Sequence, residues 1–234
     1  MIEIKKLTKQ ADNKLILRGI DLSITQGETV AILGANGAGK STLLKVLATL
    51  IKPASGLVKI NGLDLKNDHI EVKKMFGYLP HSSLLYDHYT PLENLVFFGN
   101  LYGVKDVENR ARKLVNEVGL SFFINEPVKN FSRGMIQRIA IARAIIHEPK
   151  IMLLDEPHTG LDQGAITILN NVVLSMKEKG CTTLMVTHDF KQAAAICDRI
   201  IIVKNGKIAD DFKINNKSLS LVSEKYQVLV EGGS

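Results

Sequence analysis

Tryptophan is absent from this chain of 234 residues, which contains only two cysteines and six prolines. Two cysteines are too few for the disulfide framework of a small secreted protein. Because Cys181 and Cys197 both lie in apolar periodic segments, we expect buried free thiols in a cytoplasmic protein. No apolar run reaches the roughly 18–20 residues that a membrane-spanning helix needs. Residues 1–5 show no signal-peptide pattern and are predicted to open a first strand.

Positively charged residues are in slight excess, with a formal net charge of +6, but the charged residues are scattered along the chain. A net positive charge could attract nucleic acid or an anionic membrane surface. The basic residues form only short groups that are typical of solvated faces, such as Lys73-Lys74, so we expect no nucleic-acid partner. Hydrophobic residues make up 45% of the chain, which is enough for a full core in one large domain or in a core with an added lobe.

The most informative feature present is a glycine-rich segment between a predicted strand and a predicted helix. Residues 34–41 fit the P-loop pattern G-x-x-x-x-G-K-[ST] between a strand expected over 29–33 and a helix expected over 41–50. Glycine permits a tight turn that points successive N–H groups at phosphate oxygens, and the helix N-terminus adds partial positive charge. Lys40 is expected to reach the β- and γ-phosphates, and Ser41 to ligate Mg²⁺. The predicted phosphate-binding residues are Gly34, Ala35, Asn36, Gly37, Ala38, Gly39, Lys40, Ser41 and Thr42.

Two carboxylates, Asp155 and Glu156, end an apolar strand predicted over 151–154. Because a buried parallel strand delivers its last residues to the sheet edge where the P-loop lies, Asp155 is expected to hold Mg²⁺ directly or through water. Glu156 is expected to face the γ-phosphate as the general base that polarises water. A second polar loop opens a predicted helix, with Ser132 as a candidate N-cap and Gly134 permitting close backbone approach, so this helix start is another candidate anion site.

The rest of the chain alternates between predicted strands and helices. Helical spacing dominates from residue 91 to residue 146, which predicts a helical lobe inserted into an α/β core. Strands alternating with helices imply a parallel sheet. Further helices are expected over 163–178 and 190–196, a turn over 11–13, and strands over 2–7, 15–24, 57–60, 75–79, 151–154, 182–186, 199–203 and 207–212.

These motifs, taken in order, resemble the nucleotide-binding subunit of an ATP-binding cassette (ABC) transporter. Residues 34–41 match the Walker A motif of that family, and residues 151–155 match Walker B, with Glu156 at the catalytic glutamate. The signature, usually Leu-Ser-Gly-Gly-Gln, separates this family from other P-loop proteins. The remaining matches are the signature at residues 132–137, the loop that crosses the dimer interface at 160–162, and the switch histidine at His188.

The resemblance implies a single ABC ATPase domain over residues 1–234, with a P-loop (RecA-like) core, an N-terminal antiparallel β subdomain and an α-helical subdomain at about 84–146. It implies hydrolysis of ATP with Mg²⁺, with Ser41 and Asp155 as metal ligands and Glu156, His188 and His81 as catalytic residues. Two copies, or one copy and a paralogous subunit, would clamp two ATP molecules head to tail, with Ser132 and Gly134 completing the partner's site. The chain would lie in the cytoplasm on the inner face of the cell membrane, bound to a separate integral membrane transporter subunit.

Three positions depart from the family pattern. Ala11 stands where an aromatic side chain usually stacks on adenine, so base selectivity is expected to be weak. His81 replaces the glutamine that usually follows the Tyr-Leu-Pro stretch, and it is either a coupling residue that hydrogen-bonds water or a structural surface histidine. Arg133 replaces the usual glycine of the signature, and its side chain is expected either to contact nucleotide or to face solvent.

The transported molecule is less clearly indicated than the family. Residues 81–87, 90–95 and 101–104 resemble haem exporters linked to cytochrome c maturation, although exporters of drugs or lipids share these features. A soluble ATPase of iron–sulfur assembly is another alternative, whereas a DNA-repair type is disfavoured because no sustained heptad repeat is visible. Four residues are expected either to form an apolar groove for a helix of the membrane subunit or to lie in the core of the lobe: Phe97, Phe98, Leu101 and Tyr102.

Overall fold

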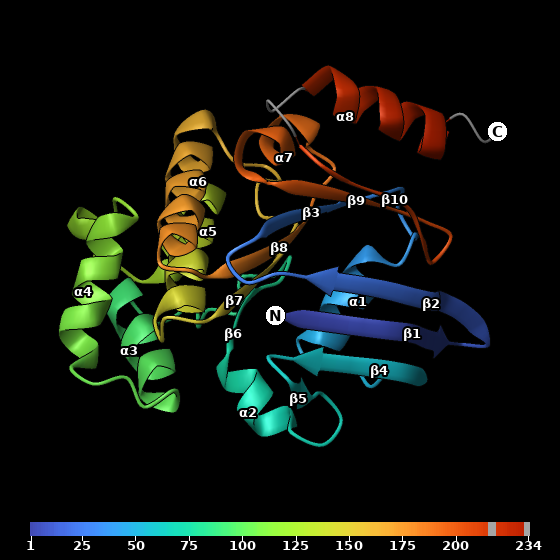
Figure 1. Ribbon diagram of the computed structural model, residues 1–234. Helices are drawn as coiled ribbons and strands as arrows, with labels where there is room; N and C mark the ends of the chain where they lie inside the picture. Colours follow the sequence, from blue (N-terminus) through green and yellow to red (C-terminus); the bar gives the residue numbers. More distant parts are fainter. Residues whose placement is uncertain (215–218, 232–234) are drawn as a thin grey trace.

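Two β-sheets organise the chain in the computed structural model, which describes residues 1–214 and 219–231 (Figure 1). One sheet has four antiparallel strands in the order β2 (Lys14–Ile24), β1 (Ile2–Ala11), β4 (Ser55–Ile60) and β5 (Leu63–Asp64). The other has six strands in the order β10 (Lys207–Lys213), β9 (Arg199–Lys204), β3 (Thr29–Leu33), β8 (Thr182–Val186), β7 (Ile151–Asp155) and β6 (Phe76–Leu79). Neighbours from β9 to β6 pair in parallel, and β10 pairs antiparallel with β9.

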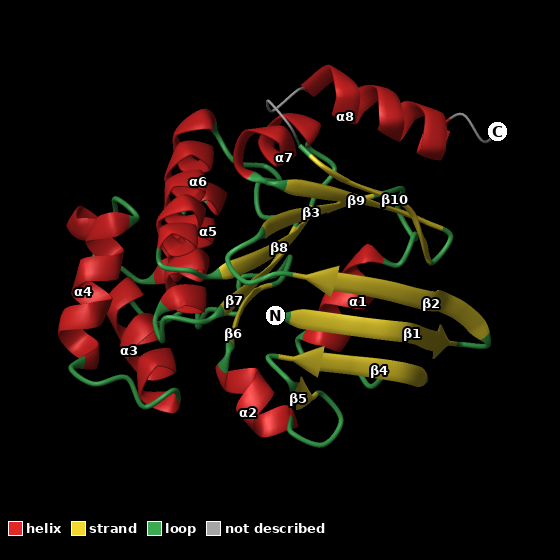
Figure 2. Ribbon diagram, viewed as in Figure 1, coloured by secondary structure: helices red, strands yellow, loops and turns green. Residues whose placement is uncertain are grey.

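Helices cover both faces of the six-stranded sheet (Figure 2). Helix α1 (Lys40–Leu47) and helix α2 (His69–Lys74) contribute to the core that this sheet shares with the antiparallel sheet. On the other face lie α5 (Arg133–Ile145), α6 (Gln163–Glu178), α7 (Phe190–Ile196) and α8 (Leu219–Tyr226). Helices α3 (Pro91–Leu101) and α4 (Val107–Glu117) pack against each other and against α5. Short 3₁₀ turns lie at 121–123 and 128–130, and a π-helical turn at 227–231. Within the described ranges, no helix is both long and apolar enough to cross a lipid bilayer.

Burial on both faces explains why the central strands are apolar at every position. In β3, Val30 and Ile32 enter the core shared with α1, whereas Ala31 and Leu33 enter the core on the opposite face. Every residue of β3, β7 and β8 is buried. A parallel strand covered on both faces produces such a continuous apolar run instead of an alternating one.

The predicted α/β fold with an antiparallel β subdomain and helical parts is confirmed, but several element boundaries differ. The helix expected over 41–50 ends at Leu47, because Thr49 has a positive φ of 60° that a helix cannot continue through. The first two strands extend to Ala11 and Lys14, where Asp12 and Asn13 both have positive φ and form a tight hairpin turn. Helices α2 and α8 are not predicted from the sequence, since each is too short to show a clear helical period.

Both cysteines are free and buried, as the apolar context of each predicts. Burial raises the pKa of the Cys181 thiol and of the Cys197 thiol to about 12. Thiolate is the reactive form of cysteine, so neither side chain is a nucleophile at neutral pH.

The buried side chain of Asn94 forms hydrogen bonds with the segment before α3. The Nδ2 of Asn94 donates to the carbonyl oxygens of Tyr86 and Thr90, both at 3.1 Å, and its Oδ1 accepts from the Tyr86 N–H at 2.8 Å. Thr90 also caps α3, because its hydroxyl accepts from the Glu93 N–H while the Glu93 carboxylate accepts from the Thr90 N–H. These bonds hold residues 86–90 against the start of the helical segment.

Replacing this asparagine tests its role. Asn94→Ala should lower the free energy of unfolding by about 2 kcal/mol, because backbone groups of Tyr86 and Thr90 lose their partners. Urea denaturation followed by circular dichroism measures the change. The matched control is Asn109→Ala, since Asn109 bonds the exposed Asp106 and should cost less than about 0.5 kcal/mol. Equal stability of the two variants would contradict the prediction.

Candidate functional site

The carboxyl ends of four neighbouring parallel strands bring the predicted site residues to one edge of the six-stranded sheet. In the spatial order β3, β8, β7, β6, the following loops carry the P-loop, His188, Glu156 and His81. Ligands of open α/β sheets bind outside this edge, where loops from adjacent strands meet. Residues that lie far apart in the sequence therefore share one location.

The P-loop holds a buried cation. Lys40 is 7% exposed, and its Nζ donates to the carbonyl oxygens of Gly34 at 2.8 Å and Ala35 at 3.0 Å. Burial lowers the pKa of Lys40, against the opposing effect of the carboxylates of Glu156 and Asp155. Glycine is required at Gly34, where φ is 151° and a Cβ atom would lie 2.2 Å from the carbonyl oxygen of Val203. The loop is thus tightly folded around an ammonium group.

A serine and an aspartate meet at the start of α1. The Ser41 hydroxyl donates to Oδ1 of Asp155 at 2.9 Å, and Asp155, the last residue of β7, is 5% exposed. Mg²⁺ prefers such oxygen ligands and usually takes only one or two from the protein, with the rest from phosphates and water. No cluster of three or more His, Cys, Asp or Glu side chains in the described part of the chain could hold a metal alone. The pair therefore fits a cation that takes most of its ligands from a phosphate substrate.

Glu156 pairs with His188 across the neighbouring loops. His188 Nδ1 lies 2.8 Å from Oε2 of Glu156, and the Thr159 hydroxyl donates to the same oxygen at 3.4 Å. A carboxylate only accepts hydrogen bonds, so Nδ1 carries the proton in this contact. Glu156 has a positive φ of 53°, a strained conformation that the bond from its N–H to the Val186 carbonyl, at 2.9 Å, helps to hold. This arrangement leaves Oε1 to accept a proton from water.

The signature loop packs against residues 160–165. Ser132 caps α5, with its hydroxyl accepting from the Met135 N–H at 3.3 Å. A Cβ atom on Gly134 would lie 3.5 Å from Cβ of Ala165, and one on Gly160 would lie 2.6 Å from Nη1 of Arg133. Arg133 therefore lies over the backbone of Gly160. Among the described residues, no hydrogen bond joins residues 132–134 to residues 34–42.

Two of the departures from the family pattern lie at exposed positions. His81 is exposed and follows Leu79, which pairs with Leu154 of β7, so it belongs to the same sheet edge as Asp155. Ala11 is exposed at the β1–β2 turn. The same hairpin reaches the P-loop further along, where a Cβ atom on Gly39 would lie 2.9 Å from the Leu17 side chain.

A groove of about 220 Å³ lies beside this sheet edge, between the end of α1 and the helical segment. Exposed apolar side chains of Leu50, Leu84 and Tyr102 line it, together with Phe98. Arg143 is 8% exposed at its wall, where its guanidinium lies 5.2 Å from the Phe98 ring centre and donates to the Tyr78 carbonyl oxygen at 2.8 Å. Of the four predicted groove residues, Phe98 and Tyr102 line it and the other two do not.

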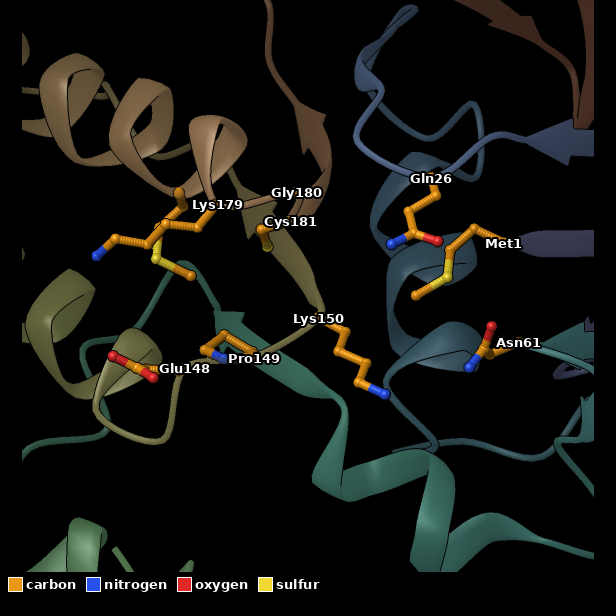
Figure 3. A pocket seen from close by; sticks show the side chains of 10 residues that line it. Met1, Gln26, Asn61, Glu148, Pro149, Lys150, Lys179, Gly180 and Cys181 are labelled. Atoms are coloured by element: carbon orange, nitrogen blue, oxygen red, sulfur yellow. The ribbon is translucent and has the colours of Figure 1, made fainter.

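A cavity of about 350 Å³ lies at the opposite edge of the sheet (Figure 3). Its lining includes Gln26, Lys150 and Cys181, which precede β3, β7 and β8. This cavity therefore lies at the amino ends of the strands, away from the P-loop and the acidic residues.

Comparison with known proteins decides the family. The family model described as ABC transporter matches residues 17–159, which is more than half of the chain. The chain belongs to the ABC transporter family. It is 40% identical to the ABC transporter ATP-binding protein NatA of Bacillus subtilis over 82% of this chain and 79% of NatA. It is 37% identical to the glutamine transport ATP-binding protein GlnQ of Escherichia coli over 90% of each chain.

A solved ABC cassette also shares the fold. The dimeric post-hydrolysis structure of the ATP-binding cassette MJ0796, bound to ADP and phosphate, matches with a TM-score of 0.80 and 30% identity over 92% of this chain and all of that one. The prediction of an ABC ATP-binding subunit with ATP hydrolase activity is confirmed at the level of the family. These comparisons do not single out the haem-exporter type.

Several contacts around the ABC site residues are not predicted from the sequence. His158 is 6% exposed and bonds Asn170, which in turn bonds Gln192. Gln137 of the signature donates to the carbonyl oxygen of Pro157 at 2.9 Å. The only sequence signal for His158 is its place two residues after Glu156, since its partner Asn170 lies in α6 and the partner of Asn170, Gln192, lies in α7.

The expectation that Ala11 stands where an aromatic side chain would stack on adenine leads to a testable prediction. Ala11→Tyr should tighten ATP binding by between about fivefold and 150-fold, because base–aromatic stacking is worth about 1–3 kcal/mol. Isothermal titration calorimetry with ATP and GTP measures the effect, and the unsubstituted protein should bind both with similar affinity. Ala11→Leu adds apolar bulk without a flat ring and is the matched control. A strong native preference for ATP that Ala11→Tyr leaves unchanged would contradict this placement of the base.

Proposed function

We propose that this chain is the ATP-hydrolysing subunit of an ABC transporter and acts as one ATPase domain that drives export through a separate membrane subunit. The observation that carries the proposal is the meeting of three groups at one sheet edge. These are the buried Lys40 in its loop, the Ser41–Asp155 pair and the Glu156–His188 pair. Together they offer a cation for phosphate, oxygen ligands for a metal and a base for water.

Residues 34–42 bind the phosphates of ATP in this proposal. Backbone N–H groups at the start of α1 point at the phosphates, and Lys40 exchanges carbonyl partners for β- and γ-phosphate oxygens. Ser41 and Asp155 hold Mg²⁺, which when bound neutralises charge that develops on the phosphates. Both side chains supply oxygen ligands, as this cation requires.

Glu156 acts as the general base. Its free carboxylate oxygen accepts a proton from water while the water oxygen bonds to the γ-phosphorus. The bond between the γ-phosphorus and the bridging oxygen breaks, and ADP and inorganic phosphate leave. His188 orients the carboxylate through the 2.8 Å contact, and we assign His81, on the loop after β6, to the contact with water or metal.

The active unit is a head-to-tail dimer, either of two copies or with a paralogous subunit. Within one chain the signature loop packs on residues 160–165 and forms no hydrogen bond with the P-loop among the described residues. A second chain would therefore supply Ser132 and Gly134 to the nucleotide. The dimeric MJ0796 cassette, which shares this fold, supports the assembly.

The membrane subunit docks in the groove lined by Leu50, Leu84, Phe98 and Tyr102. Apolar residues on one face of a helix bind such a groove, and the groove opens near the loop that carries His81. In this proposal the chain lies in the cytoplasm, on the inner face of the cell membrane. The cargo proposed first is haem, on the resemblance of residues 81–104 to haem exporters, with drugs or lipids as the alternative classes.

An iron–sulfur assembly ATPase is the competing function. Such a protein would need no integral membrane partner. Binding of a membrane subunit in the groove would therefore distinguish the proposed function from this alternative. Affinity purification from detergent-solubilised membranes of the native cell should recover an integral membrane protein with the unsubstituted chain. Recovery of only soluble partners would favour the competing function.

Glu156→Gln tests the catalytic assignment. The amide keeps the shape but cannot accept the proton, so ATP turnover should fall about a hundredfold or more while ATP binding persists. Size-exclusion chromatography with light scattering should then show an ATP-dependent dimer. Glu148→Gln is the matched control, since Glu148 has the same φ of 53° but lies at the opposite sheet edge.

Adding Lys40→Ala to Glu156→Gln completes the test. The double variant should neither bind ATP nor form the dimer, because the phosphates lose their buried cation. Undiminished turnover in Glu156→Gln, with a monomer in the presence of ATP, would overturn the assignment of the base.

A further inference from the structure

His158 has no role in the chemistry proposed above, but its hydrogen bonds lie next to the residues that perform that chemistry. His158 is 6% exposed, two residues beyond Glu156, and its Nε2 lies 2.8 Å from Oδ1 of Asn170 in α6. Asn170 Nδ2 donates to Oε1 of Gln192 in α7 at 2.8 Å, and Gln192 is 6% exposed. These bonds form a continuous bridge from the loop after β7 to the helix after β8.

The hydrogen-bond pattern defines the state of the imidazole ring. Asn170 gives its amide hydrogen to Gln192, so its oxygen faces His158 and Nε2 must be the donor. Nδ1 of His158 is buried and has no partner in the described structure. Turning the amides over would place a buried N–H at Nδ1 without an acceptor, which is costlier than an unpaired ring nitrogen that carries no hydrogen.

Burial also lowers the pKa of His158, although the bond to Asn170 and the charges of Asp189 and Glu156 oppose that shift. The hydrogen-bond geometry and the burial of His158 both indicate a neutral ring with its hydrogen at Nε2. His158 is therefore a fixed donor at neutral pH, unlike a histidine that exchanges protons with solvent.

The bridge joins the same two loops as the Glu156–His188 pair. Gln192 lies in the first turn of α7, and its N–H donates to Asp189, the residue after His188, at 3.0 Å. Glu156 and His188 thus contact each other on the exposed side of the two loops. On the interior side, the loops are connected by the hydrogen bonds among His158, Asn170 and Gln192. A shift of α7 relative to the loop after β7 would change both connections together.

We infer that His158 is a positioning residue for ATP hydrolysis. Through Asn170 and Gln192, it fixes the position of Glu156 relative to His188. The inference rests on the role of Glu156 proposed above. Losing the bridge should lower kcat by between about tenfold and a hundredfold, because small displacements of a base have large effects on rate. The KM for ATP should stay within about twofold, since no hydrogen bond joins the bridge to the P-loop among the described residues.

Two conservative substitutions separate donor position from ring shape. In His158→Gln the amide nitrogen can occupy the place of Nε2 and keep the bond to Asn170, so kcat should be retained. In His158→Asn the shorter amide reaches only the place of Nδ1, so kcat should fall. Asn170→Leu removes both bonds of the bridge at similar volume and should match His158→Asn. Steady-state ATPase rates, with thermal melts for folding, measure these effects.

Thr182→Val is the matched control, because Thr182 is a fully buried residue whose hydroxyl accepts from the Gly27 N–H at the other end of the sheet. It should lower the melting temperature and leave kcat unchanged. The inference is overturned if His158→Asn and Asn170→Leu hydrolyse ATP as the unsubstituted protein does. It is equally overturned if His158→Gln falls as far as His158→Asn, or if Thr182→Val lowers kcat as much.

Glu156→Gln, measured in the same assay, keeps the two proposals distinguishable. If it is inactive while His158→Asn is fully active, the positioning role fails and the proposed function stands. If Glu156→Gln is fully active, the proposed base is wrong and the positioning role is overturned with it.

Discussion

The parallel pairing of β8 with both β3 and β7 is the constraint on which the rest of the site depends. A single residue, Val186, pairs with Ile32 of β3 on one side and with Asp155 of β7 on the other. This register brings the two strand ends level, so the P-loop begins where the acidic residues end and Ser41 meets Asp155 at 2.9 Å. A slip of one residue would turn Asp155 toward the opposite face of the sheet.

Buried charge at that edge is balanced locally by dipoles. Lys40 is held by two carbonyl groups of its own loop and Asp155 by a hydroxyl, and neither forms an ion pair within the described residues. A buried ion needs such hydrogen bonds to remain charged. Because both charges are solvated by neutral groups, a phosphate and a cation can replace those groups without first breaking a salt bridge.

The sequence predicts what depends on local pattern. The P-loop is predicted from the glycines, lysine and serine of residues 34–41. The central strands are predicted from their continuous apolar runs, which occur because both faces of the sheet are covered. Contacts between distant segments are not predicted. Arg133 is exposed, as one of the two predicted alternatives has it, but its contact with Gly160 is not predicted. The buried state of His158 likewise depends on two helices that follow it, and nothing in the residues around it shows those partners.

The two cysteines have a practical consequence for spectroscopy of this protein. Cys181 and Cys197 are the only thiols in the chain, and both are buried with a pKa raised to about 12. Maleimide and iodoacetamide reagents attack thiolate at accessible sites, so the folded protein presents almost no labelling background. A fluorophore or spin label attached to one engineered surface cysteine would report from that position alone, with no native cysteine removed.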